Sequence, residues 1–326
     1  MNRGTSLRLL GAAVAVLVAG GPVAAEDAIV VVATTGMIAD VAAEVAGPCA
    51  EVEALIGPGL DPHLYQASAS DVARLGRADA ILFSGLGLEG QLGAVLDRLG
   101  RTRPTLAVAE AAVPEDRLIP VQAVGGVDPH VWMDPALWGG IAPVIAGFLG
   151  DIVPQCADDM SARAQAYREQ TEALAEWVAE AITTIPEERR TLVTAHDAFG
   201  YYARAYGLEE VGIQGISTDA EASVADIRAT AALVVEAAVP AIFVETTINP
   251  RTVEAVIEAA RVRGHDVALG GNLYSDAMGE EGTPGGTYLG MIYENTRTIV
   301  TALGGELPPL PVALSGWASE WELPAG

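Results

Sequence analysis

Long apolar runs are scarce in this sequence, and the clearest one lies at the amino end. Leu9–Val18 follows two arginines and precedes the small residues Val23–Ala25, a pattern typical of a secretory signal peptide cleaved after Ala25. No later stretch reaches the roughly 20 apolar residues that a transmembrane helix needs. We therefore expect export to the periplasm without membrane insertion. Glu26 rather than cysteine follows the cleavage point, which favours a free protein over a lipid-anchored one.

Cysteine is also scarce, and basic charge is low. The two cysteines, Cys49 and Cys156, form no C-x-x-C pattern, so neither a redox centre nor a thiolate zinc site is expected. Export would allow the two to pair, although the sequence leaves open whether they do. Acidic residues number 43 against 18 basic ones, which argues against nucleic acid or an anionic membrane as a partner.

Short β-branched or apolar runs alternate with longer helical patterns, which is typical of parallel sheets with helical crossovers. In the first half we predict strands at 29–33, 52–56, 80–84 and 106–109, and helices at 37–46, 68–75, 89–99 and 135–149. In the second half we predict strands at 191–195, 211–216, 241–245 and 266–269, and helices at 198–206, 223–237, 250–263 and 286–303.

Residues 158–185 contain neither glycine nor proline until Pro186, which predicts one long helix. The predicted fold is therefore α/β, with two lobes that each hold a mostly parallel sheet flanked by helices. A signal peptide (1–25) precedes the first lobe (26–157), and the long helix joins it to the second lobe (186–326). A stiff helical connection would damp wide hinge motion between the lobes.

Histidine occurs only four times, so each position is informative. His63 and His130 each follow an Asp-Pro pair, and His196 ends the predicted strand at 191–195. Residues at the carboxyl ends of parallel strands face the crevice where ligands bind, so these three imidazoles can converge. A proline just before an imidazole fixes the backbone that carries it. His265 lies at the opposite edge of the second sheet, and we predict that it is not a ligand.

Carboxylates accompany these histidines. Asp276, in the loop after the last predicted strand, is the candidate oxygen ligand, because that loop gives it reach into the cleft. Glu245 ends a strand on the same rim and is either a supporting residue or an alternative ligand. Asp61, Asp128 and Asp134 could each accept the second N–H of an imidazole. For Asp134 a helix N-cap is an equally good interpretation, because Pro135 follows it.

At this point the sequence resembles the zinc- and manganese-specific solute-binding proteins of bacterial ABC importers. The matching segments occur in the family's order and span nearly the whole mature chain. They are Val32–Ile38, Gly59–His63, Asp128–Pro135, Ala195–Tyr201, Ile242–Glu245 and Leu273–Asp276. The resemblance implies two lobes joined by a rigid helix, with a metal buried between them and delivered to an ABC permease. A periplasmic metallochaperone is a further candidate partner, and a monomer is expected.

Carried over position by position, the resemblance makes His63 and His130 the ligands from the first lobe, and His196 and Asp276 those from the second. Manganese-directed members tend to carry Glu at the third position, and many zinc-directed members carry His. Three nitrogens and one carboxylate suit Zn²⁺ better than Mn²⁺. However, residues 101–127 lack the His-rich loop of many zinc-directed relatives.

Other interpretations remain open from the sequence. A manganese-binding protein of the same type is the nearest alternative. A zinc-dependent hydrolase could use the same residues, but four protein ligands would leave no position for the water that catalytic zinc keeps. A binder of metal chelates or other small solutes would need arginine and aromatic residues around a larger pocket, and Tyr65, Trp132, Trp138 and Tyr274 are candidates. Nothing in the residues supports an adhesin.

Overall fold

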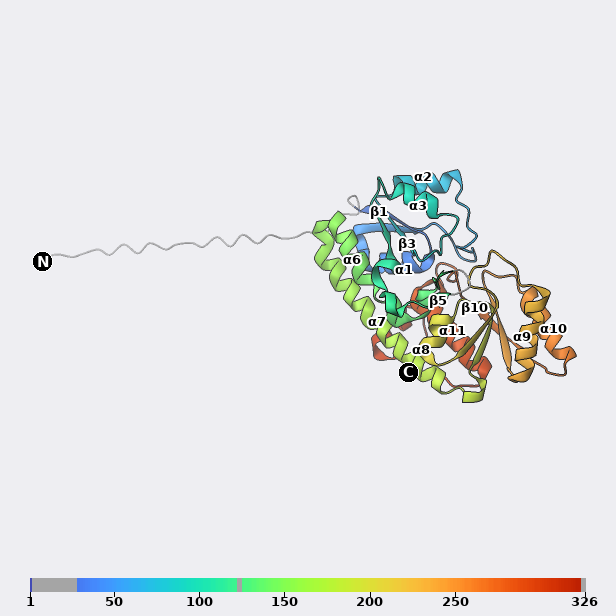
Figure 1. The fold of residues 1–326 in the computed structure, drawn as a ribbon. Helices are drawn as coiled ribbons and strands as arrows, with labels where there is room; N and C mark the ends of the chain where they lie inside the picture. Colours follow the sequence, from blue (N-terminus) through green and yellow to red (C-terminus); the bar gives the residue numbers. More distant parts are fainter. Residues whose placement is uncertain (2–27, 122–124, 324–326) are drawn as a thin grey trace.

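The computed structural model describes every residue except 2–27, 122–124 and 324–326. The predicted signal peptide therefore lies, apart from Met1, outside the described residues. The described chain forms two α/β lobes with a long helix along one side of the molecule (Figure 1). The predicted fold class is confirmed.

The first lobe is built on a parallel four-stranded sheet in the order β2-β1-β3-β4. Its strands are β1 (Ile29–Ala33), β2 (Ala50–Ala54), β3 (Ala80–Phe83) and β4 (Thr105–Ala107). Its helices are α1 (Gly36–Ala46), α2 (Ala69–Arg77), α3 (Gly93–Leu99) and α4 (Val108–Ala112), with α5 (Pro135–Trp138) and α6 (Ile141–Ile152) completing the lobe. Ser68 and Asp71 form a capping box that fixes the start of α2.

The second lobe repeats this architecture with the strand order β10-β9-β7-β8. Its strands are β7 (Thr191–His196), β8 (Glu209–Gln214), β9 (Ala241–Glu245) and β10 (Ala268–Leu273). Its helices are α8 (Gly200–Tyr206), α9 (Val224–Glu236), α10 (Arg251–Val262), α11 (Tyr288–Leu303) and α12 (Ser315–Glu320). The central strand β7 is buried along its whole length, as a two-sided parallel sheet requires.

The long helix α7 (Ala157–Thr183) packs against α1, α5 and α6 of the first lobe and against α8 and α11 of the second. One continuous apolar core extends from β1 and α1 through α7 to α11. Separate, smaller cores lie under the outer helices α2 and α3 of the first lobe and α9 and α10 of the second. The inner halves of the two lobes are thus held together by shared apolar packing.

The predicted helix at 135–149 is two helices, because the chain breaks at Gly139 and Gly140. A Cβ at Gly139 would lie 2.1 Å from Oγ1 of Thr171, so only glycine allows this close approach to α7. By length and composition, residues 135–152 are the one helical stretch among the described residues that could cross a membrane. Half of this stretch is buried in the structure, as in the core helix of a globular protein.

Two further predicted elements differ from the structure by more than two residues at one end, whereas strands such as β2 and β8 are shifted by about two residues. The helix predicted from Glu89 begins at Gly93, because the Glu89 carboxylate turns inward to accept hydrogen bonds from Thr34 and from the backbone of Ser84. The last strand, predicted to end at Leu269, continues to Leu273 with a register shift. Gly270 lies within this strand and does not end it. Glycine is needed at this position because a Cβ would lie 2.5 Å from the ring of Phe243 on the neighbouring strand β9.

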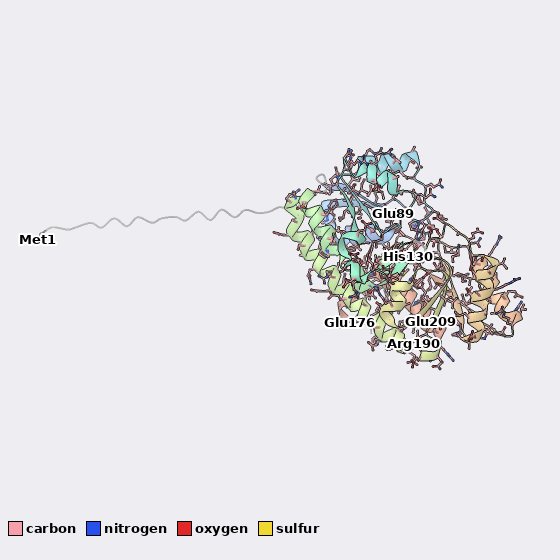
Figure 2. The ribbon with its side chains drawn as sticks, in the orientation of Figure 1. Met1, Glu89, His130, Glu176, Arg190 and Glu209 are labelled. Carbon is pink, nitrogen blue, oxygen red and sulfur yellow. A yellow bond between two sulfur atoms is a disulfide. The ribbon has the colours of Figure 1, made fainter. Side chains whose placement is uncertain are left out.

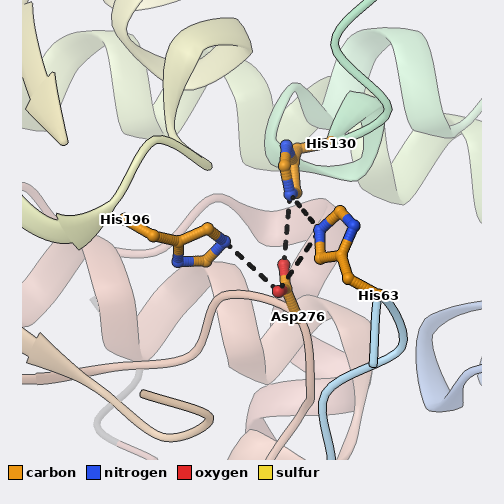
Figure 3. Close-up of side chains that lie close together, drawn as sticks. All are labelled: His63, His130, His196 and Asp276. Atoms are coloured by element: carbon orange, nitrogen blue, oxygen red, sulfur yellow. Dashed lines mark hydrogen bonds and ion pairs between the residues drawn. The ribbon is translucent and has the colours of Figure 1, made fainter. Parts of the chain in front are cut away.

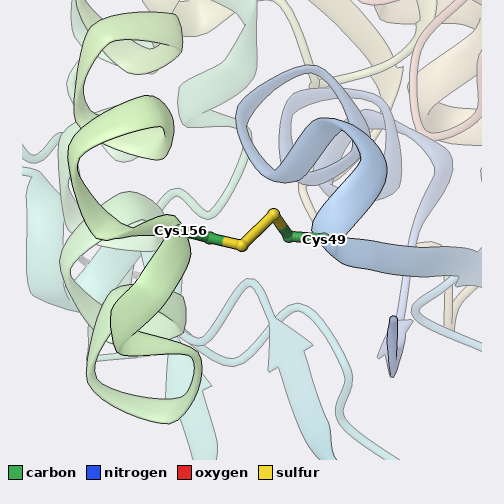
Figure 4. The surroundings of a disulfide bond; sticks show 2 residues. All are labelled: Cys49 and Cys156. Atoms are coloured by element: carbon green, nitrogen blue, oxygen red, sulfur yellow. A yellow bond between two sulfur atoms is a disulfide. The ribbon is translucent and has the colours of Figure 1, made fainter. Parts of the chain in front are cut away.

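The two cysteines form a disulfide (Figure 4). Cys49 ends a short 3-10 turn just before β2, and Cys156 directly precedes α7. The bond therefore fixes the start of the long helix to the first lobe, and it settles what the sequence leaves open.

Candidate metal centre

Four buried side chains from distant parts of the sequence meet where the two lobes adjoin (Figure 3). One potential ligand atom from each of His63, His130, His196 and Asp276 lies within 4.8 Å of the others. The Nε2 atoms of His130 and His196 lie 3.3 and 3.2 Å from the two Asp276 oxygens, and Nε2 of His63 lies 3.7 Å from Oδ2. Figure 2 shows His130 near the middle of the molecule. The structure thus brings together all four predicted ligands.

Parallel topology explains two of these positions. His196 is the last residue of β7, and Asp276 follows β10 at the same edge of the sheet. His63 lies in the loop after β2 of the first sheet. His130 differs from the expectation, because it follows no strand of that sheet. It is placed by a small antiparallel hairpin, β5 (Pro120–Val121) and β6 (Gly126–Val127), whose two-residue strands gave no periodic signal.

Two imidazoles are oriented by carboxylates on their far side. Nδ1 of His130 lies 2.7 Å from Asp128, which also accepts the His130 backbone N–H. Nδ1 of His196 bonds to Glu245 at the end of the neighbouring strand β9. Because Nδ1 is the donor in each case, Nε2 carries the lone pair toward the cluster when the imidazole is neutral. Glu245 therefore supports His196 and lies outside the four-residue cluster.

The other two predicted acceptors act differently. Asp61 accepts the backbone N–H of His63 at 2.8 Å rather than a ring N–H, and its second oxygen accepts a hydrogen bond from Thr218 of the other lobe at 2.6 Å. Asp134 caps α5 by accepting from the backbone of Ala136 and Leu137. The helix-cap interpretation was thus the right one for Asp134. Nothing in the sequence marks Thr218, because its role depends on a contact between distant loops.

His265 lies outside the cluster, as predicted. Its Nε2 donates to the carbonyl oxygen of Val239 at 2.8 Å, which links the segment after α10 to the segment before β9. This is an ordinary structural role for a histidine.

The pKa values of the four clustered residues are shifted in different directions. Burial alone would lower the pKa of His130, but the charges of Asp128 and Asp276 outweigh it and raise the pKa to about 9. Burial likewise opposes the charged form of His196, yet Glu245 and Asp276 hold its pKa well above the ordinary value. The pKa of His63 is lowered, mainly by burial. Burial also opposes the charge of Asp276, but the neighbouring imidazoles hold its pKa well below the usual range.

The site contains buried polar atoms whose only partners among the described residues lie within the cluster. Apart from the imidazole–carboxylate contacts at 3.2, 3.3 and 3.7 Å, Nε2 of His196 and both oxygens of Asp276 have no hydrogen-bond partner there. The exposed fractions of His63, His130, His196 and Asp276 are 6, 0, 0 and 1%. Buried polar atoms are normally fully hydrogen-bonded, and a bound cation would give these atoms a common partner. The arrangement therefore fits a buried metal with three histidine ligands and one aspartate ligand.

The aromatic residues near the site pack rather than line a ligand pocket. Trp132 and Trp138 are fully buried, and Nε1 of Trp132 donates to the carbonyl oxygen of Ser275 at 2.9 Å. Tyr65 bonds to Asp71 at the start of α2. A cavity of about 480 Å³ adjoins Asp276, but its described lining contains neither arginine nor aromatic side chains. This lining gives no support to binding of an organic chelate.

Comparison with known proteins identifies the family. The sequence profile described as "zinc-uptake complex component A periplasmic" matches residues 31–302. This chain belongs to that family. It is 45% identical over 280 residues to the zinc-binding protein TroA of Treponema pallidum, which covers 86% of this chain and 90% of the relative. It is 43% identical over 279 residues to the manganese-binding lipoprotein MntA of Bacillus subtilis strain 168. This match covers 86% of this chain and 91% of the relative.

The fold agrees with the same family. The solved structure of the periplasmic zinc-binding protein TroA from Treponema pallidum superposes with a TM-score of 0.82 at 44% identity, covering 85% of this chain and 99% of that one. The family consists of extracytoplasmic solute-binding proteins that capture divalent metal for ABC import, not of enzymes. The hydrolase alternative is therefore set aside. Zinc and manganese are not distinguished, because relatives named for each are about equally similar.

Proposed function

We propose that this protein binds Zn²⁺ in the periplasm through His63, His130, His196 and Asp276 and delivers it to the permease of an ABC importer. The observation that carries the proposal is the convergence of four buried side chains, each with one potential ligand atom within 4.8 Å of the others, where the lobes adjoin. Three imidazole nitrogens and a carboxylate form a donor set that suits zinc. The similarity to a relative named as zinc-binding supports the same choice.

Manganese is the second candidate, and one feature of the site favours it. Among the described residues, both oxygens of Asp276 contact only the clustered imidazoles, so this carboxylate can bind a metal through two oxygens once the imidazole protons are displaced. The donor count would then rise from four to five, which suits the harder Mn²⁺ better than a tetrahedral site does. The relative from Bacillus subtilis is named as manganese-binding.

Competition titration of the metal-free protein tests the proposal. Zn²⁺ and Mn²⁺ are each titrated at pH 7 against a chromophoric chelator, with a His130→Ala variant as the control that lacks one ligand. We expect one tight zinc site in the wild type and a large loss of affinity in the variant. Equal zinc affinity in both proteins would contradict the proposal. Elemental analysis of protein purified from the native periplasm, together with an anomalous scattering peak at the site, then identifies the physiological ion.

The domain organisation is part of the proposal. We infer that residues 1–25 direct export and are removed, and that lobes 26–157 and 186–326 are held by the helix 158–185. A free periplasmic monomer is the form we expect to meet the permease, with a metallochaperone as a candidate metal donor. Intact-mass measurement of the protein from its native periplasm tests the first point. A lipid-modified or uncleaved amino end would contradict it.

A further inference from the structure

We propose that His63 is the ligand that withdraws when metal enters or leaves, and that the Asp61–Thr218 hydrogen bond holds it in place. The proposal rests on the proposed function, which makes the four clustered residues the metal ligands. In this proposal His63 moves, and the other three ligands stay together. The order of the ligands along the chain would instead suggest that each lobe carries two of them when the lobes separate.

His130 is bonded to the second lobe although it belongs to the first half of the sequence. Just before it, the carbonyl oxygen of Asp128 accepts a hydrogen bond from the hydroxyl of Tyr201 at 2.8 Å. Just after it, the carbonyl oxygen of Trp132 accepts from the hydroxyl of Tyr288 at 2.7 Å, and the Trp132 indole donates to the carbonyl oxygen of Ser275. All three bonds are buried, so the backbone around His130 is fixed to the elements that carry His196 and Asp276.

The His63 segment is held less firmly. It lies between the end of β2 and the start of α2, in a stretch without helix or strand. Asp128 and Glu245 orient the rings of His130 and His196, but Nδ1 of His63 bonds to no residue that the structure describes. The apolar residues Leu60 and Leu64 on either side of His63 are 48 and 44% exposed. Pro62 and His63 are buried, whereas the flanking Leu60 and Leu64 contribute little packing against displacement of this segment.

A cavity of about 240 Å³ reaches the cluster at His63. It is formed by both halves of the chain, with Leu86 and Pro129 from the first and Ile216 and Asp219 from the second. Of the four proposed metal ligands, His63 is the one that lines this cavity. Its side chain is also the most exposed of these four. An ion that enters through this cavity meets His63 first, and withdrawal of His63 opens the path by which the ion leaves.

Asp61 couples His63 to the second lobe. One carboxylate oxygen accepts the backbone N–H of His63, and the other accepts the hydroxyl of Thr218 in the loop between β8 and α9. Thr218 is only 6% exposed. Separating these two loops would break the Asp61–Thr218 bond and carry His63 away from the ion, while the buried bonds around Trp132 stay intact. Asp61 and Thr218 are therefore positioning residues for metal retention.

Metal-release kinetics test this inference. Zinc-loaded protein is mixed with excess chelator in a stopped-flow instrument, and the release and association rates are measured separately. Loss of a hydrogen bond to a charged group should make release about tenfold faster in Thr218→Val and Thr218→Ala, with association little changed. Thr218→Ser keeps the hydroxyl and should release zinc like the wild type. Thr102→Val is the matched control, because Thr102 is exposed, donates to the carbonyl oxygen of Leu99 at 3.2 Å and lies outside the lining of the cavity at His63.

Hydrogen exchange gives a second, independent measurement. Zinc binding should slow amide exchange in residues 57–67 more than in residues 128–134. Equal slowing in both segments, or release from Thr218→Val at the rate of the wild type or of Thr102→Val, would overturn the inference. These outcomes leave the proposed function standing, because they require that zinc binds. A wild-type protein that binds no metal would remove the proposed function and this inference together.

Discussion

Glu245 accepts two hydrogen bonds from His196, one from the backbone N–H at 2.8 Å and one from ring Nδ1. The two residues end the adjacent strands β7 and β9, and both are buried. The negative charge of Glu245 strengthens the bond that Nε2 of His196 can form with a metal. Carboxylates that support a metal-binding histidine in this way contribute about 10–100-fold to metal affinity.

Glu245→Gln tests this relationship, because it keeps the size of the side chain and removes its charge. We expect zinc affinity to fall by about tenfold, measured by competition with a chelator. Glu258→Gln is the control, since Glu258 is exposed and pairs with Arg261 on the surface of α10. Unchanged affinity in Glu245→Gln would show that the carboxylate has no influence on the metal.

The four clustered residues should differ sharply from the fourth histidine. Replacing His63, His130, His196 or Asp276 with Ala removes one of four ligands, so we expect zinc affinity to fall by more than about 100-fold in each case. His265→Ala removes a hydrogen bond to Val239 outside the cluster and should leave affinity unchanged. Similar losses in all five variants, measured by the same competition assay, would refute the ligand assignment.

Zinc binding should release protons at pH 7. In the metal-free protein the pKa of His130 is about 9 and that of His196 is well above its ordinary value, so both imidazoles carry a proton at neutral pH. A metal must displace these protons, so affinity should rise as the pH increases toward 9 and fall as it decreases. His63 has a lowered pKa and should contribute little to this effect.

Calorimetry in two buffers with different ionisation enthalpies measures the proton release directly. The observed heat should differ between the buffers in proportion to the protons released. Competition titrations at pH 6, 7 and 8 should show increasing affinity. The same heat in both buffers, together with a pH-independent affinity, would contradict the assigned protonation states.

Much of the fold could be predicted from the sequence because parallel α/β architecture leaves strong local signals. The strands β1 and β9 have the predicted bounds, and the long helix α7 follows from a stretch without glycine or proline. Errors occurred where long-range contacts override local preference. Gly139 breaks a helix because it touches α7, and Glu89 leaves its predicted helix for partners on other segments.

The same distinction applies to the site. Scarce histidines after Asp-Pro pairs and at a strand end were enough to select residues that the structure brings together. The bonds that connect the lobes, from Thr218 to Asp61 and from Trp132 to Ser275, were not predictable. Each joins residues far apart in the sequence, one of them through a backbone carbonyl, which every residue possesses.

The Cys49–Cys156 disulfide should stabilise the protein without affecting metal binding. It closes a long loop, with a sequence separation of 107 residues, and thereby restricts the unfolded chain. We expect the Cys49→Ala/Cys156→Ala double variant to lose about 2–5 kcal/mol of unfolding free energy, measured by denaturant titration of the metal-free protein. Cys49 lies before the amino end of β2, whereas His63 follows its carboxyl end, so zinc affinity of the folded variant should match the wild type. A variant that keeps its stability but loses zinc affinity would show instead that the bond positions the metal ligands.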